Sequence, residues 1–330
     1  MTTKYNNVYI NATGTVTGPY EANGPFSKYF DRSYNDFYFG TSTWEQAESK
    51  LIMDSIDILL SKIGKTRFDI DLHISGDLLN QIVASNYAAS NLKIPYLGIY
   101  NACATSVEGL IIASNFIESK QITNAIVSVS SHNNGAEKQF RYPVEYGGPK
   151  RKTTTFTTTG GASAYLSREK SSIKVDSTTV GIVTDLGVKD VYHMGAVMAP
   201  AAGDVIYNHL KDTKREIDYY DLILTGDLGI YGKNILKDYM MTKYNIALGD
   251  NYNDCGVMLY DLDNQPVLAG ASGPVCSALV VFGYIYKEML KEKYKRVLIV
   301  PTGAVFSPTF TFQKESIPSM ANAISLEVNI

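Results

Sequence analysis

The stretch IDLHISGDL, residues 70–78, returns 150 positions later as YDLILTGDL, residues 220–228. In each copy a short apolar run ends in a glycine, which an aspartate and a leucine follow. Runs of this kind, bounded by turn residues, predict buried β-strands. Because the similarity occurs at one fixed spacing, it indicates that the chain contains two copies of a single unit.

The repeat extends beyond these two strands. Residues 271–277 and the apolar run after them resemble residues 101–106 and the run that follows those, at an offset of about 171 positions. The larger offset predicts an insertion near residues 241–262. Within it, the segment Cys255–Tyr260 is expected to form an extra hairpin.

Alternating strands and helices in both halves predict an α/β protein. Residues 1–170 and residues 171–330 each follow the order βαβαβαββ. Because helices cover both faces of such sheets, the two halves should stack as αβαβα layers. The segment 131–158, rich in Gly, Tyr, Arg and Glu, is expected to be a long loop, and long loops in compact domains usually carry function.

The composition excludes several classes of protein. Of the 330 residues, 45% are hydrophobic and 19% are charged, so the chain is not intrinsically disordered. The net charge of −3 and the lack of a basic block argue against a nucleic-acid-binding protein. The low charge also leaves surface that a partner can cover, because interface cores contain few charged residues.

The apolar stretches and the cysteines favour an intracellular protein. The apolar run Val275–Tyr286 is shorter than the roughly 20 residues that a membrane-crossing helix needs. The first residues contain no apolar core of a signal peptide. Cys103, Cys255 and Cys276 are odd in number and widely spaced, which favours free thiols over a disulfide framework or a zinc site.

Cys103, within Asn101-Ala-Cys-Ala-Thr-Ser106, stands between an expected strand and an expected apolar helix. The free amides and the positive dipole end of a helix N-terminus favour a thiolate or a bound anion. The same residues are equally compatible with a small buried cysteine that fills a tight turn. Both interpretations stay open from this motif alone.

A second candidate group follows the expected strand 125–131. His132 can polarise a ligand oxygen or pair with a carboxylate, and Arg141 can clamp a carboxylate through two hydrogen bonds. The alternatives are a histidine bonded to a backbone carbonyl and a solvated surface arginine. The nearby Glu137 and Tyr142 make the loop rich in polar and aromatic groups, which favours a functional role for His132.

Asp77 and Asp227 end the two repeated strands, where open α/β sheets place their ligands. An aspartate at this position is also a common cap of the helix that follows. Capping alone explains why an acid occurs twice, so we favour it over a direct role in a site.

Longer motifs carry a resemblance to a known family. They are Gly18-Pro19, Gly24-Pro25, Ser75–Gln81, Ala102–Ser106, Ser130–Asn133, Gln139–Gly148, Met198–Ala202, Leu224–Leu228, Asn253–Gly256 and Thr302–Ala304. The duplicated pattern with a cysteine at a strand–helix elbow resembles the thiolase superfamily, whose ketoacyl synthases hold an acyl group on that cysteine. Within it, the chain most resembles the stage V sporulation protein AD family of spore-forming bacteria.

The resemblance implies a thiolase-like fold and a binding protein without a cofactor. The ligand that it implies is dipicolinic acid (pyridine-2,6-dicarboxylate), alone or with calcium, which is loaded into the developing spore together with membrane proteins of the same operon. It also implies a soluble protein or one peripheral to the inner membrane of the forespore or spore, and a homodimer as in other thiolase relatives.

Departures from the enzyme pattern favour binding over catalysis. Condensing enzymes pair the elbow cysteine with a histidine and an asparagine, where this sequence has Thr225–Leu228 and Ala269–Ser272. Asp227 is therefore expected near the usual place of the imidazole, where it would oppose a developing anion and raise the pKa of Cys103. The alternatives are an acyltransferase or condensing enzyme with Cys103 as nucleophile, and a structural subunit of a membrane channel.

These considerations give a hypothesis for the ligand site. Backbone amides after Cys103, with His132 and Arg141, would face the two carboxylates, and Tyr142 would stack on the ring. The residues expected at the site are Cys103, Ala104, His132, Asn133, Arg141, Tyr142, Asp77 and Asp227. Asp77 or Asp227 would orient His132 or hold calcium, which prefers oxygen ligands.

Overall fold

The computed structural model describes residues 1–140 and 150–329. The main elements occur in the same order in both halves. The first half contains β2 (Tyr9–Thr17), α2 (Trp44–Ile63), β4 (Leu72–Gly76), α3 (Val83–Leu92), β5 (Tyr96–Gly98), α4 (Thr105–Glu118), β6 (Asn124–Ser131) and β8 (Gly160–Ser167). The second half contains β9 (Ile173–Val180), α6 (Met194–Thr213), β10 (Leu222–Thr225), α7 (Gly229–Tyr244), β11 (Tyr252–Asp254), α9 (Pro274–Ala278), the π-helix η7 (Leu279–Ile285), α10 (Tyr286–Leu290), β13 (Arg296–Val300) and β15 (Ser319–Val328).

Each half builds the same sheet. The strand order is β5-β4-β6-β8-β2 in the first half and β11-β10-β13-β15-β9 in the second. The two sheets join where β2 pairs with β9, at Tyr9–Lys174 and Ile10–Ile173. The common order confirms the predicted α/β fold with duplicated βαβαβαββ halves.

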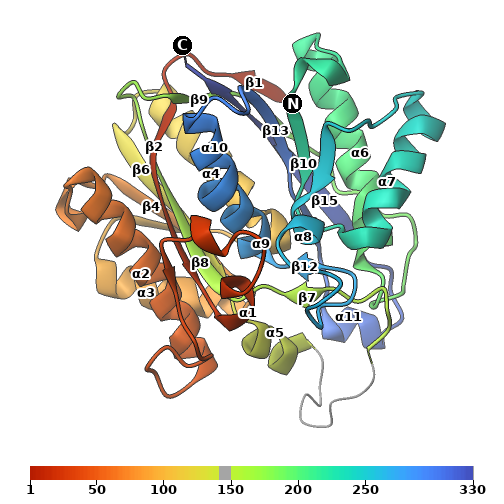
Figure 1. Ribbon diagram of the computed structural model, residues 1–330, viewed down its shortest axis with the longest axis horizontal. Helices are drawn as coiled ribbons and strands as arrows, with labels where there is room; N and C mark the ends of the chain where they lie inside the picture. Colours follow the sequence, from red (N-terminus) through yellow and green to blue (C-terminus); the bar gives the residue numbers. More distant parts are fainter. Residues whose placement is uncertain (141–149, 330) are drawn as a thin grey trace.

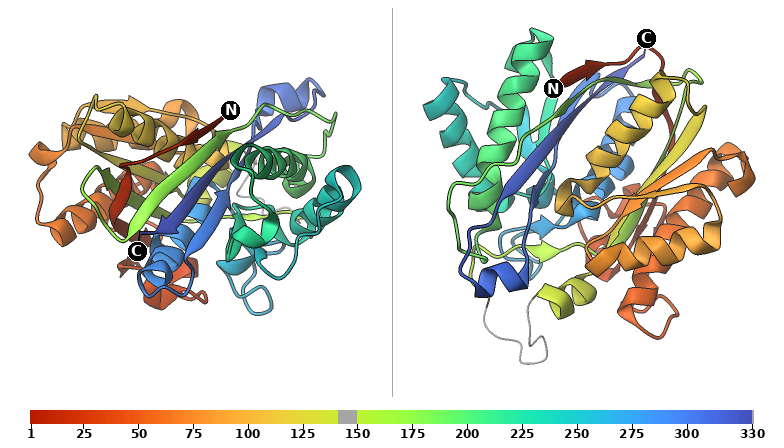
Figure 2. Two further views of the ribbon diagram at one scale, coloured as in Figure 1. Left: turned by 90° about the horizontal axis from the view of Figure 1, so that it is seen from above. Right: turned by 180° about the vertical axis from the view of Figure 1, so that it is seen from behind.

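Helices lie on both faces of each sheet (Figure 1). α2 and α3 cover the outer face of the first sheet, and α6 and α7 cover the outer face of the second. Between the sheets, α4 contacts β6 and β15, and η7 contacts β2 and β8. Figure 2 shows these αβαβα layers from above and from behind. Within the described residues, no helix combines the length and the apolar character that a membrane span requires.

The sequence explains where the outer helix α2 begins, ends and packs. Thr43 accepts a hydrogen bond from the N–H of Gln46 at 3.2 Å, as an N-cap does. Gly64 ends the helix in the left-handed conformation, with φ of 62°. A Cβ atom on Gly161 of β8 would lie 2.2 Å from the carbonyl oxygen of Leu51, so the helix packs this closely only against glycine.

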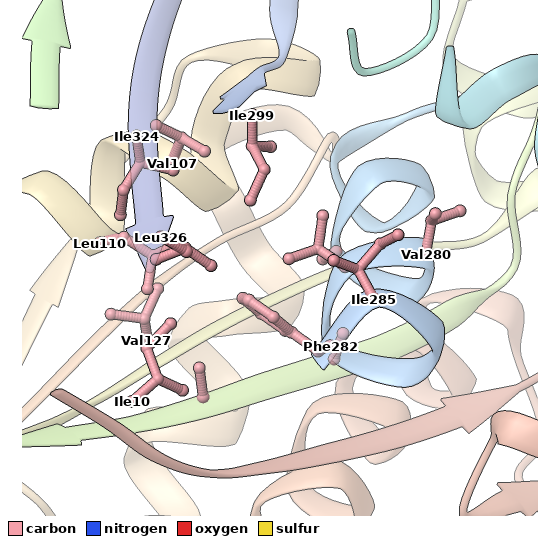
Figure 3. Close-up of a cluster of buried hydrophobic side chains, with 14 of the residues drawn as sticks. Ile10, Val107, Leu110, Val127, Val280, Phe282, Ile285, Ile299, Ile324 and Leu326 are labelled. Carbon is pink, nitrogen blue, oxygen red and sulfur yellow. The ribbon is translucent and has the colours of Figure 1, made fainter. Parts of the chain in front are cut away.

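The largest hydrophobic cluster lies between the two sheets (Figure 3). Ile10 and Val127 come from the first sheet, Leu326 comes from the second, and Leu110 and Phe282 come from the helices between them. Each of these side chains is nearly fully buried, and such burial stabilises a fold by roughly 1.5–3 kcal/mol per side chain. The middle helices therefore hold the two halves together.

The two halves meet at equivalent residues. Ser106 in α4 and Ser277 in α9 are 171 positions apart in sequence, and their Oγ atoms lie 3.2 Å apart. If an approximate two-fold axis relates the two halves, equivalent residues that lie near the axis contact each other. The axis of the duplication therefore passes through the middle layer.

Two predicted segments differ from the structure. Cys255–Tyr260 is not a hairpin, because residues Cys255–Met258 form the short helix α8, capped by Asp254, which accepts the N–H of Val257 at 3.2 Å. The strand before it, β11, is the counterpart of β5. The expected loop 131–158 contains the helix α5 (Asn133–Phe140) directly after β6.

Candidate functional site

Cys103 lies at the sharp turn that joins β5 to α4. Ala102 adopts a left-handed φ of 45°, and its carbonyl accepts a hydrogen bond from the Thr105 hydroxyl at 2.7 Å. The strand β14 (Thr302–Ala304) packs against this turn, because a Cβ atom on Gly303 would lie 2.4 Å from the Asn101 carbonyl oxygen. Because Gly303 has no side chain, the second half of the chain can lie close to the first-half cysteine.

The Cys103 thiol donates a hydrogen bond to the carboxylate of Asp227. Asp227 follows β10 and is 1% exposed. Its Oδ2 accepts the N–H of Gly273 at 3.2 Å, and its Oδ1 accepts the Thr302 hydroxyl at 3.4 Å. Gly273 also directs its N–H toward the Cys103 sulfur. The site therefore combines one residue of the first half with three of the second.

This arrangement sets the protonation of both acidic groups. Burial and the nearby Asp227 raise the pKa of the Cys103 thiol well above its ordinary value. Cys103 keeps some exposed surface, whereas the other two cysteines are buried. Burial raises the pKa of Asp227 to about 7, against the lowering effect of its hydrogen bond with Cys103. At neutral pH Asp227 is therefore roughly half protonated and can donate a hydrogen bond.

Asp77, the counterpart of Asp227, is a helix cap. Its Oδ1 accepts the N–H of Leu79 and its Oδ2 accepts the N–H of Ser85, both at 2.8 Å. Ser85 lies in the first turn of α3, and Asp77 is fully buried. The favoured capping interpretation holds for Asp77, which was also expected at the ligand site, and does not hold for Asp227.

His132 is engaged with an aromatic cluster rather than with Cys103. Its Nε2 lies 2.8 Å from the carbonyl oxygen of Phe37, and its Nδ1 accepts the N–H of Gly135 at 3.4 Å. The ring stacks on Trp44 with centroids 6.4 Å apart, and burial lowers the pKa of the imidazole. Because α5 begins directly after His132, the ring satisfies a free amide of that helix. Its contact with a ligand stays a prediction.

Two further predicted residues are bound to backbone near the elbow. The Asn133 side chain donates to the carbonyl of Thr157 at 3.2 Å, in the strand β7 (Phe156–Thr157). β7 pairs with β12 (Ala271–Ser272), which leads into the Gly273 turn. The N–H of Ala104 donates to the carbonyl of Asn101 at 3.0 Å, so it is not free for an anion as predicted. The predicted residues that lie outside the described part of the chain are Arg141 and Tyr142.

Apolar side chains form a wall beside the elbow. Leu78, Ala102 and Ala136 make a small buried cluster, and Phe140 packs against it. The Phe140 ring lies 5.6 Å from the ring of Phe306, which follows β14. The site thus combines polar groups around Cys103 with an apolar and aromatic side.

Sequence analysis missed Gly273 and Thr302, which bind Asp227. A signal existed for Gly273: at the offset of 171 it is the counterpart of Ala102, the residue before Cys103. Both residues have a left-handed φ, of 101° at Gly273 and 45° at Ala102. Applying the repeat offset to the elbow would therefore have identified the second turn of the site. Thr302 carries the same signal, because at the offset of 171 it is the counterpart of Ser131, the last residue of β6.

One surface hollow lies apart from this site. A hollow of about 480 Å³ lies between α2 and α3, where Met53, Lys65 and Asn91 are among its lining residues. Cys103 is not part of its lining. Within residues 1–140 and 150–329, no three His, Cys, Asp or Glu side chains gather in an arrangement that could hold a metal ion.

The whole chain is similar to one bacterial family. A sequence model of the family described as stage V sporulation protein AD matches residues 2–327. The chain is 44% identical over 320 residues to stage V sporulation protein AD of Bacillus subtilis (strain 168), which covers 97% of this chain and 94% of that protein.

Solved structures of other proteins share the fold. The structure of 3-oxoacyl-[acyl-carrier-protein] synthase III from Aquifex aeolicus VF5 has a TM-score of 0.59 at 13% identity, covering 97% of this chain and 99% of that one. A cerulenin-bound structure of Xanthomonas campestris OleA has a TM-score of 0.62 at 13% identity, covering 98% of this chain and 100% of that one. At such low identity the likeness shows the fold, which is thiolase-like.

Proposed function

Because this chain belongs to the stage V sporulation protein AD family, we propose that it binds dipicolinic acid, alone or as its calcium chelate, for uptake into the developing spore, and that it catalyses no reaction. The observation that carries this proposal is the Asp227 carboxyl hydrogen-bonded to Cys103. The elbow at which thiolase-fold enzymes hold an acyl group is present here, with a thiol that is not activated.

The surroundings of Cys103 oppose nucleophilic catalysis. The thiolate is the reactive form of cysteine, and burial together with Asp227 raises the pKa of this thiol. The hydrogen-bond partners of the four histidines are Ser128 for His73, Phe37 and Gly135 for His132, Ala196 for His193, and Thr179 and Tyr220 for His209. In the described part of the chain, no histidine is therefore bonded to Cys103 as a general base.

The same groups suit a flat ligand with two carboxylates. A protonated Asp227 can donate a hydrogen bond to a carboxylate oxygen, while the Gly273 amide and the Thr302 hydroxyl hold the Asp227 carboxyl in place. The apolar wall with Phe140 offers a surface for an aromatic ring. These features support dipicolinate as the ligand beside Cys103.

Calorimetry tests the proposal directly. Titration of the protein with dipicolinate, with and without calcium, should give saturable heat and a raised melting temperature, whereas calcium alone should give neither. Benzene-1,3-dicarboxylate, which lacks the ring nitrogen, is the control ligand. Absence of heat and of a melting shift at millimolar dipicolinate, in both arms, would reject binding by this chain.

A pair of bulky substitutions tests the position of the ligand. Cys103→Phe fills the space at the elbow and should abolish the heat of binding. Ser61→Phe places the same ring in the exposed hollow between α2 and α3 and should leave binding unchanged. The opposite pattern would move the ligand to that hollow and overturn the assignment to Cys103.

The proposal includes partners and a location. We propose a homodimer that pairs through the edge strand β5, where Leu97 is 40% exposed and the following Tyr100 is 48% exposed. We also propose that the protein works at the inner membrane of the forespore or spore with membrane proteins of the same operon. Leu97→Asp should convert a dimer into a monomer in light scattering, and an unchanged mass would reject this interface.

The retained cysteine favours one alternative, an acyltransferase or condensing enzyme. The two solved structures reported above carry a synthase name and a bound cerulenin, respectively. Incubation with acyl-CoA followed by mass spectrometry separates the functions, because an acyl group on Cys103 would support the enzyme. If the chain takes neither dipicolinate nor an acyl group, a structural subunit of a membrane channel is the remaining function.

A further inference from the structure

The two halves use equivalent aspartates differently. In the first half, Asp77 accepts the N–H of Leu79, two residues later. The equivalent amide in the second half is that of Gly229, 150 positions after Leu79. It does not bind Asp227, the counterpart of Asp77, because Asp254 accepts it at 3.0 Å. The Gly229 amide, which is equivalent to the amide that binds Asp77, is therefore already bound to Asp254.

The strand register explains this difference. In the first half Ser75 of β4 pairs with Gly98 of β5, and in the second half Thr225 of β10 pairs with Asp254 of β11. Ser75 and Thr225 are counterparts at the offset of 150, so Asp254 stands where the first half has a glycine. Gly98 has no side chain with which to cap α3, and Asp77 does so instead.

Asp254 is fully engaged as a cap. It is completely buried and accepts hydrogen bonds from the Thr225 hydroxyl at 2.7 Å and from the N–H groups of Leu228, Gly229 and Val257 at 2.9, 3.0 and 3.2 Å. Burial raises the pKa of Asp254, and these four donors oppose that rise by stabilising the charged carboxylate. Asp227 has the longer bonds to Gly273 and Thr302, together with the Cys103 thiol.

We propose that Asp254 is a positioning residue of the Cys103 site, which caps α7 in place of Asp227 and thereby leaves Asp227 free to face Cys103. This proposal concerns the site whose ligand is proposed above. Its test uses no ligand, so it stands or fails independently of dipicolinate binding.

The arrangement also divides charge and proton between two buried carboxyls. The titratable groups that act on Asp227 are Asp254, Cys103, Cys255 and Cys276. None of them is a cation, whereas Lys233 acts on Asp254, which also has more donors. Asp254 therefore gives up its proton first, and Asp227 is roughly half protonated near neutral pH. A proton on Asp227 is what makes the elbow accept a carboxylate-bearing ligand rather than repel it.

The test is the pH profile of Cys103 alkylation by iodoacetamide, followed by mass spectrometry. In Asp254→Ala, Asp227 should turn to the free Gly229 amide, and the pKa of Cys103 should fall. The alkylation rate at pH 8 should then rise at least about threefold for each unit of that fall, since the gain in thiolate outweighs its lower nucleophilicity. Asp254→Asn keeps an acceptor for the amides and should retain the wild-type profile.

Two controls separate positioning from damage to the fold. Cys255 and Cys276 are buried, so their labelling reports unfolding. In an Asp227→Asn background, Asp254→Ala should add no further increase in the alkylation rate of Cys103. The side chain at position 227 then carries no charge, so turning it away from Cys103 changes nothing.

Three outcomes overturn the proposal. The first is an unchanged Cys103 profile in Asp254→Ala while Cys255 and Cys276 stay protected. The second is an equal additional increase in the Asp227→Asn background. The third applies if Asp254→Ala unfolds, so that only Asp254→Asn can be measured. Because Asp254→Asn retains the cap of α7, a lowered Cys103 pKa in this variant would contradict the role proposed for Asp254.

Discussion

Glu21 in the short helix α1 (Pro19–Ala22) should make the protein less stable as the pH rises. Its carboxyl is fully buried and accepts hydrogen bonds from the Tyr260 hydroxyl and from the N–H of Thr159. Burial raises the pKa of Glu21 from its ordinary 4.5 to about 7. Between these values the unfolded chain loses the proton while the folded chain keeps it. The contribution of Glu21 to the free energy of unfolding is therefore full below pH 4.5 and is lost as the pH rises through 7.

The rise in pKa fixes the expected magnitude. At about 1.4 kcal/mol per pKa unit, the rise from 4.5 to about 7 corresponds to about 3 kcal/mol. Glu21→Gln keeps the shape and the hydrogen-bonding oxygen but cannot ionise. Relative to the wild type, its free energy of unfolding should therefore increase by about 3 kcal/mol between pH 5 and pH 8.5.

Urea denaturation of both proteins at the two pH values measures this difference. Comparing variant with wild type cancels the contribution of the other buried acids, which also favour the protonated state. Glu315→Gln, at an exposed glutamate, is the matched control and should show no such gain. If the stability difference between Glu21→Gln and the wild type is the same at both pH values, the reasoning about the buried carboxyl is refuted.

Three other substitutions have defined outcomes. Gly161→Ala forces a Cβ to 2.2 Å from the Leu51 carbonyl oxygen and should lower the free energy of unfolding by about 3 kcal/mol or more in urea denaturation. Asp31→Asn loses charge-assisted bonds to lysines on α2 and α10 at 2.8 and 3.2 Å and should cost about 2 kcal/mol at pH 7. That cost should fade below about pH 4, because the pKa of Asp31 is lowered and its contribution is lost as the carboxylate is protonated. Asp227→Asn removes a negative group from Cys103 and should lower the thiol pKa in an alkylation profile.

Each of these has a control on the same molecule. Gly249→Ala meets nothing closer than 3.7 Å and should change stability by less than about 0.5 kcal/mol. Asp218→Asn, at an exposed aspartate, should show no pH-dependent loss. Asp77→Asn changes the equivalent aspartate of the first half, which caps α3, and should leave the Cys103 profile close to that of the wild type.

The fold could be predicted because the repeat occurs in residues that determine strands. Each half places the same apolar run before the same Gly-Asp-Leu turn, and the buried strands β4 and β10 follow from it. The contact between Ser106 and Ser277 shows that even the offset of the middle helices was correct. Apolar periodicity reports burial, and burial decides the layers of an α/β fold.

The insertion and the long loop were less predictable. Cys255–Met258 is a helix because Asp254 caps it, and the pattern of apolar residues in so short a segment does not distinguish a turn of helix from a strand. α5 lies within the segment expected to be a loop, and its mean hydropathy is low. A surface helix of this kind depends on contacts such as that of His132 with Gly135, which sequence does not reveal.

The backbone position of a site residue was easier to predict than the direction of its side chain. Cys103 stands between a predicted strand and a predicted helix, so its place at the elbow could be predicted. The directions of His132, Asp77 and Asp227 depend on which free helix amide each side chain satisfies. That competition is decided by a neighbouring strand, at Asp254 in one half and at Gly98 in the other, and only the register of β5 and β11 reveals it.

A crystal structure of the protein with dipicolinate would show whether the ligand lies at the Cys103 elbow. We expect a ring beside Cys103, with one carboxylate near Asp227 and Gly273, and an unmodified sulfur. Dipicolinate bound only elsewhere on the chain, or an acyl group attached to Cys103 in protein as purified, would contradict it.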